Sequence, residues 1–153
     1  MTTSNAITEH PVALAAPRGR RISAGVIGGV AGGVVFGMMM AMMGMLPVIA
    51  SMVGTASPWV GFALHLVISI MIGLGLTVLF GNRLLTGYGR GALVGVAYGA
   101  IWWALGPLMM LPLMMGMPLF TVDMPALLSL MGHMIYGAIL GLTAVRVLAG
   151  RHG

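Results

Sequence analysis

The chain is poor in charge and contains no cysteine. Only 6% of its 153 residues are charged, namely seven arginines and two acids, Glu9 and Asp123. Soluble domains carry about 25% charged residues. Because 59% of the residues are hydrophobic, and a chain of this length has too much surface to hide them, a soluble fold is excluded. The absence of cysteine excludes a disulfide framework and thiol chemistry.

Acidic side chains are almost absent, which argues against an enzyme. Asp123 is the only carboxylate near the apolar runs, and its place beside Pro125 is typical of a helix N-cap. Neither a paired-acid site nor a catalytic triad can be assembled within the runs. A proton-coupled transporter would ordinarily need an intramembrane carboxylate. We therefore expect a non-enzymatic integral membrane protein with an accessory or structural role.

Three long windows carry no formal charge: Ile22 to Asn82, Gly91 to Val122, and Met124 to Val145. About 20 apolar residues span a bilayer core, so the first window is long enough for two passes and each of the others for one. The sequence therefore predicts an all-α protein with a bundle of four transmembrane helices in contact with the lipid bilayer. We expect the helices near 22–46, 58–80, 91–111 and 125–147.

The arginines predict the topology of these helices. All seven fall at the ends of the predicted spans that share one side of the membrane, whereas Asp123 falls on the other side. The positive-inside rule places both termini in the cytoplasm. We expect residues 1–21 to be a flexible cytoplasmic tail, residues 22–148 the membrane domain, and residues 149–153 a short cytoplasmic tail. Because the positive charges flank apolar runs, the net charge of +5 does not indicate a nucleic-acid partner.

The second and fourth predicted helices resemble each other at an offset of 68 residues. Each begins at a proline, and a histidine follows seven or eight residues later: Pro58 and His65 in one, Pro125 and His133 in the other. The other two helices are alike more loosely, as glycine-rich stretches after an arginine. This pattern indicates two tandem helical hairpins of the same orientation, although membrane composition alone could also produce it.

Small residues recur every four positions along all four predicted helices. In lipid, helices associate through close backbone contact at such residues. We therefore expect these rows of small residues, here called glycine seams, to pack the helices together. A seam without a partner inside the bundle would support a homo-oligomer or contact with another membrane protein. The packing glycines are Gly25, Gly29, Gly33, Gly37, Gly91, Gly95, Gly99, Gly137 and Gly141.

His65 and His133 lie on these seams, and an ionisable side chain inside a membrane is a functional candidate. A structural role is the alternative, because Ser69 and Ser129 each lie four residues from one of the histidines and can bond to it within the helix. The sequence alone leaves both interpretations open.

Methionines supply a sharper possibility around the two histidines. Of 17 methionines, all but Met1 and Met71 fall in the predicted outer half. Thioether and imidazole ligands suit Cu(I), whereas methionine is also an adaptable filler beside prolines. If a soft-metal site exists, the candidate ligands are His65, His133, Met38, Met42, Met110, Met114, Met131 and Met134.

Two histidines at similar depth on separate helices could instead hold a b-type haem, since haem iron accepts axial imidazoles. The sequence therefore leaves three options open: a structural protein, a Cu(I) site and a haem site.

Several short motifs resemble the YagU-like family of small bacterial inner-membrane proteins. They are His65 with Ser69, Gly91 with Gly95, the stretch 112–118 leading to Asp123 and Pro125, and Gly132-His133. The resemblance covers about residues 58–146. It implies a multi-helix protein of the bacterial inner membrane and no particular mechanism. The third predicted helix departs from the family pattern, because Trp102-Trp103 stands there without a histidine.

Overall fold

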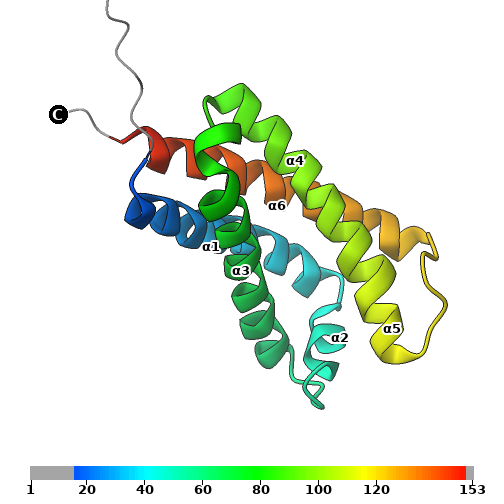
Figure 1. The fold of residues 1–153 in the computed structure, drawn as a ribbon. Coiled ribbons are helices and arrows are strands. Elements are labelled where there is room, and N and C mark those ends of the chain that lie inside the picture. Colours follow the sequence, from blue (N-terminus) through cyan, green and yellow to red (C-terminus); the bar gives the residue numbers. More distant parts are fainter. Residues whose placement is uncertain (1–15, 151–153) are drawn as a thin grey trace, which may run out of the picture.

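Helices form nearly the whole of the computed structural model, which describes residues 16–150 (Figure 1). No strand occurs among these residues. Four spans are long and apolar enough to cross a membrane, which confirms the predicted four-helix membrane bundle. The elements are α1 (Arg18–Met42), α2 (Leu46–Ser51), α3 (Pro58–Leu84), α4 (Tyr88–Leu105), the π-helix η1 (Gly106–Met110), α5 (Leu111–Met115) and α6 (Met124–Ala149).

The two central helices of the bundle are α1 and α6. Helix α3 packs along α1, α6 packs along the other side of α1, and α4 packs along α6. In contrast, α3 and α4 meet at few points and diverge from the turn that connects them, with the short α2 beside the far part of α3 (Figure 1). The spans therefore follow the order α3, α1, α6, α4, with an incompletely closed seam between the first and the last.

In both hairpins, α1 with α3 and α4 with α6, the helix backbones come into close contact at glycines. A Cβ atom added at Gly29 would lie 2.7 Å from the Ser69 carbonyl oxygen of α3. In the other hairpin, a Cβ atom at Gly95 would overlap the Gly137 carbonyl of α6. Each glycine predicted to pack helices stands at a crossing where an added Cβ would collide with the neighbouring helix. Such close contact adds dispersion that a larger residue would prevent.

The contacts at these crossings repeat between the hairpins. Gly73 of α3 faces Gly25 and Gly29, and Gly141 of α6 faces Gly91 and Gly95 in the same way. The repeat therefore has an offset of 68 residues for α3 and α6 and of 66 residues for α1 and α4. The sequence comparison described α1 and α4 only as glycine-rich stretches that follow an arginine. The contacts give a definite alignment of the two helices, in which Gly91 corresponds to Gly25.

Two predicted spans are interrupted. The first was expected to run to residue 46, but α1 ends at Met42, the chain turns at Gly44 (φ +67°), and α2 starts at Leu46. Pro47 lies in the first turn of α2, where the missing N–H costs no helix hydrogen bond. The third span was expected at 91–111, but it starts at Tyr88 and widens into η1 at Pro107. A proline removes a helix hydrogen bond, and a π-turn is one way to absorb the loss.

The other two spans are longer than predicted at one or both ends. Helix α3 continues to Leu84, and α6 runs from Met124 to Ala149. Helix α1 also begins earlier than expected, at Arg18, so the last residues of the predicted N-terminal tail are helical. Residues 1–15 and 151–153 of the two predicted tails lie outside the described part of the chain.

Two arginines tie the start of α1 to its neighbours. Arg21 donates a hydrogen bond to the Val78 carbonyl of α3 (2.8 Å), and Arg20 donates to the Leu148 carbonyl of α6 (3.2 Å). The last carbonyls of a helix lack intrahelical partners and carry the negative end of the helix dipole. Leu148 belongs to the last turn of α6, so Arg20 stabilises that helix end through charge and hydrogen bonding. Val78 lies six residues before the end of α3, so Arg21 instead bonds to a carbonyl within the helix and ties α1 to α3.

Candidate functional site

His65 lies on α3 with its ring turned into the α1 contact. The side chain is 8% exposed, and Nε2 lies 3.1 Å from the Gly33 carbonyl oxygen of α1. Because a carbonyl can only accept, Nε2 carries the proton and donates it. The Ser69 hydroxyl oxygen is 3.5 Å from the same nitrogen. The predicted serine is thus close, but the shorter contact goes to the backbone of the neighbouring helix.

His133 lies on α6 and bonds within its own helix. Its Nδ1 donates to the Ser129 carbonyl oxygen at 2.8 Å, while the Ser129 hydroxyl oxygen is 3.4 Å away. The predicted partner residue is therefore correct, although its backbone makes the shorter contact. The two histidines differ in orientation, because one is fixed through Nε2 to another helix and the other through Nδ1 to its own helix.

Phe36 of α1 joins the two histidines into one cluster. Its ring centroid lies 5.2 Å from that of His65 and 4.7 Å from that of His133, both in edge-on geometry. The two imidazole centroids are therefore no more than about 10 Å apart. A Cβ atom on Gly132 would overlap the phenyl ring, so this glycine makes room for Phe36. The sequence placed both histidines on seams but did not point to the phenyl ring between α3 and α6.

One ring nitrogen of each histidine remains without a hydrogen bond inside the described chain. These are Nδ1 of His65 and Nε2 of His133, since the opposite nitrogens donate to carbonyls. In the neutral ring each free nitrogen presents a lone pair. A histidine that binds metal usually donates its other N–H to a carbonyl or carboxylate, which fixes the tautomer and the ring orientation. The cluster therefore has two imidazole nitrogens whose orientation is fixed and whose lone pairs are available to a metal ion.

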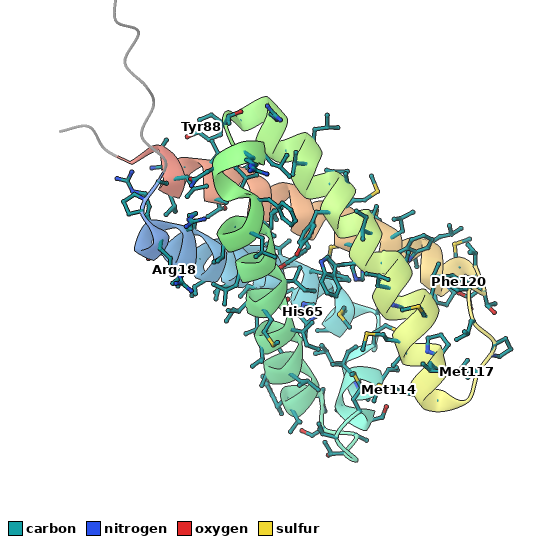
Figure 2. All side chains as sticks on the ribbon, viewed as in Figure 1. Arg18, His65, Tyr88, Met114, Met117 and Phe120 are labelled. Atoms are coloured by element: carbon teal, nitrogen blue, oxygen red, sulfur yellow. The ribbon has the colours of Figure 1, made fainter. Side chains whose placement is uncertain are left out.

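The predicted methionine ligands are not buried with the histidines. All six have exposed side chains, from 39% for Met134 to 89% for Met42. Figure 2 shows Met114 and Met117 away from His65, toward the tip of α5. Within residues 16–150, no group of three or more His, Cys, Asp or Glu side chains could hold a metal ion. The methionine that does enter the core is Met40, which is 8% exposed.

A haem does not fit this cluster as it is packed. Phe36 packs against both imidazoles, so a macrocycle held by the two histidines would have to displace its ring. The phenyl group is only 6% exposed and belongs to the core. The two histidines and Phe36 therefore do not fit a bis-histidine haem.

Two tyrosines, which the sequence did not single out as site residues, complete the polar interior. Tyr136 of α6 is 2% exposed, and its hydroxyl donates to the Ser69 carbonyl of α3 at 2.6 Å. Its ring passes Gly32 of α1, where a Cβ would lie 2.8 Å from a ring carbon. Tyr98 of α4 similarly donates to the Ile72 carbonyl of α3 at 3.0 Å. Both hydroxyls therefore link helices whose main chains are otherwise in little contact.

Asp123 is the N-cap of α6, as predicted. Its carboxylate accepts a hydrogen bond from the Ala126 amide at 2.9 Å. The Ala126 carbonyl in turn accepts from the indole N–H of Trp103 at 2.8 Å. This carboxylate is thus used to start a helix, and the indole fixes that start against the α4 span.

Comparison with known proteins found no matching family model, no matching curated protein and no matching solved structure.

Proposed function

We propose that the chain is a non-enzymatic accessory or structural protein of the bacterial inner membrane. The observation that carries this proposal is the use of polar side chains inside the spans. His65, Tyr98 and Tyr136 each donate to a backbone carbonyl of another helix. Such bonds stabilise a fixed helix arrangement in lipid, which is what a scaffold or docking subunit requires.

The same proposal places both termini in the cytoplasm. The described arginines lie at the start of α1, the end of α3, the start of α4 and the end of α6. Figure 1 places these four helix ends on one side of the molecule. Asp123 lies at the start of α6, at the opposite end. An excess of arginine on one side supports a cytoplasmic assignment for that side.

The absence of native cysteine permits a direct test of the topology. Single cysteines replacing Thr86, in the α3–α4 turn, and Thr121, before α6, would be treated in intact cells with a membrane-impermeant maleimide. We expect labelling at position 121 and protection at position 86 until the membrane is opened. The reverse pattern would refute the orientation, and labelling of both would refute four complete spans. The unmodified chain is the control for background labelling.

A structural role predicts a defined neighbour and no turnover. A photo-crosslinking residue would be placed at exposed Val67 on α3 or Leu93 on α4, with buried Leu140 as the matched control position. We expect one reproducible adduct, either with a second copy or with one other membrane protein, from an exposed position only. Diffuse lipid adducts from every exposed position would refute a docking or scaffold role.

Soft-metal binding is the second candidate function, and the two free imidazole nitrogens favour it. Nδ1 of His65 and Nε2 of His133 would supply nitrogen ligands, while methionine thioethers would supply the sulfur that Cu(I) prefers. The exposed positions of Met38 and Met42 mean that their side chains would have to swing inward to take part. A protein with such a site would store or transfer copper. The hydrogen bonds from the histidines to backbone carbonyls would hold the two imidazole rings in place.

Elemental analysis tests this candidate. The protein would be purified in detergent, loaded anaerobically with Cu(I), washed and compared with a His65→Ala/His133→Ala variant. The second candidate predicts bound copper that the double variant loses, while Met71→Leu, a methionine away from the cluster, keeps it. Absence of copper from the loaded wild-type protein would refute metal binding and leave the structural proposal unaffected.

A further inference from the structure

The repeat relates α1 to α4 and α6 to α3, so the helix pairs α1–α6 and α4–α3 are equivalent. Helices α1 and α6 pack closely along a closed seam, whereas the seam between α3 and α4 is open. In the closed seam, Gly28 and Gly32 let the α1 backbone approach α6, so that a Cβ at Gly28 would lie 2.8 Å from Leu140. The 66-residue register places Val94 and Tyr98 of α4 at the positions of these two glycines. Their larger side chains hold α4 away from α3, whose contact with α4 is slight.

A cleft of about 390 Å³ lies in the open seam. Its walls include Leu76, Phe80 and Leu84 of α3 and Val94, Ala97 and Tyr98 of α4. Apart from the Tyr98 hydroxyl, which is bonded to the Ile72 carbonyl, these side chains are apolar. The cleft therefore has the lining that an apolar chain requires, and it opens on the lipid-facing surface of the bundle.

Arginines extend both walls of the cleft toward the end of the bundle. Arg83 follows Phe80 by three residues on α3, and Arg90 precedes Val94 by four residues on α4. Residues at these spacings share a helix face. Both arginines are exposed, and within residues 16–150 neither has a hydrogen bond or an ion pair with another side chain. The only acid in that part of the chain, Asp123, lies at the opposite end of the bundle.

We propose that the α3–α4 cleft binds one anionic phospholipid. An acyl chain lies between the apolar walls, and the headgroup phosphate lies at Arg83 and Arg90. The apolar slot accounts for the chain, and the two exposed guanidinium groups account for the negative headgroup, since arginine pairs strongly with phosphate oxygens. Basic residues between helices at a membrane surface are a known mode of headgroup binding. This proposal is independent of whether the histidine cluster binds metal.

Native mass spectrometry of the full chain released from detergent tests the headgroup. Phosphatidylglycerol and phosphatidylcholine with identical acyl chains would be titrated separately. Each arginine near a membrane surface contributes about a 5-fold gain in affinity for an anionic lipid. We therefore expect Arg83→Gln/Arg90→Gln to weaken phosphatidylglycerol binding by roughly 25-fold. Equal affinity of the wild type for the two lipids would overturn the proposal.

The matched charge control is Arg18→Gln/Arg146→Gln, which removes two exposed arginines from the same end of the bundle but from outside the cleft walls. We expect it to keep phosphatidylglycerol affinity within about 2-fold of wild type, because screening weakens charges away from the bound phosphate. A loss equal to that of the cleft variant would show a general surface-charge effect and overturn a specific site. Millimolar inorganic phosphate should not displace the lipid, and displacement would show that the arginines bind free phosphate instead.

A second pair of variants tests the acyl slot. Ala97→Phe fills the cleft from an exposed wall position, whereas Leu93→Phe places the same ring at an exposed position of α4 that does not line the cleft. Both should retain helix content and thermal stability, and only Ala97→Phe should reduce lipid retention. If Ala97→Phe instead changes a dimer into a monomer in light scattering and leaves lipid binding intact, the cleft is an interface between copies and the lipid proposal is wrong.

Discussion

Substitution of Gly95 by alanine should weaken the bundle, even though alanine is the better helix former. In a helix interior, alanine is favoured over glycine by about 1 kcal/mol. At position 95, however, the added Cβ would overlap the Gly137 carbonyl of α6, which is backbone and cannot rotate away. Overpacking of this kind costs about 1–3 kcal/mol, and the separation of α4 from α6 also loses dispersion along the crossing. We expect a net decrease of about 1–2 kcal/mol in the free energy of unfolding.

Gly89→Ala is the matched control on the same helix, because no atom lies within 4 Å of an added Cβ there. It should leave stability unchanged or raise it by about 0.5–1 kcal/mol. The assay is unfolding by sodium dodecyl sulfate in mixed detergent micelles, followed by the helical circular dichroism signal. If Gly95→Ala stabilises the protein as much as Gly89→Ala does, close backbone approach does not hold the α4–α6 hairpin together.

Substitutions at three further positions test individual contacts in the same unfolding assay. Tyr136→Phe removes the hydroxyl bonded to the Ser69 carbonyl and should cost about 0.5–1.5 kcal/mol; an unchanged stability would show that this bond does not contribute. Asp123→Ala removes the cap on the Ala126 amide and should cost about 1 kcal/mol, whereas Asp123→Asn should retain most of the stability; an equal loss from both would contradict capping. Phe36→Ala leaves a cavity between the two histidines and should cost about 3–5 kcal/mol, and a loss below about 1 kcal/mol would show that Phe36 is not tightly packed between His65 and His133.

The four spans could be predicted from this sequence, whereas the direction in which each side chain points around its helix could be predicted only in part. Hydropathy and charge gave the four spans, and the four-residue glycine spacing identified the close faces because glycine has one dominant use in a membrane helix. The methionines show the limit of this reasoning. They were placed at the histidine level, but Met38 and Met42 lie on exposed faces whereas Met40 is buried, since a flexible apolar side chain is compatible with either lipid or core.

The histidine cluster depends on information that residue spacing does not contain. The main partner of His65 is a backbone carbonyl 32 residues away, and because every residue type carries a carbonyl, no side chain in the sequence marks this partner. Phe36 contacts both histidines only because α1 lies between α3 and α6. The division between α1 and α2 and the π-helix at Pro107 were missed for a local reason. Glycine and proline are both tolerated within transmembrane helices, so Gly44 and Pro107 do not by themselves indicate an interruption of an apolar run.

The central place of α1 has a consequence for biosynthesis. Among the described helices α1 is made first, yet one of its two packing faces has no partner until α6, the last of them, has been synthesised. The same holds for Arg20, whose acceptor at Leu148 is 128 residues further along the chain. During translation the Gly28 and Gly32 face of α1 must therefore remain in contact with lipid or with the insertion machinery. The packing of α1 is completed only once α6 has been synthesised, so shortening of α6 should affect the whole bundle and not that helix alone.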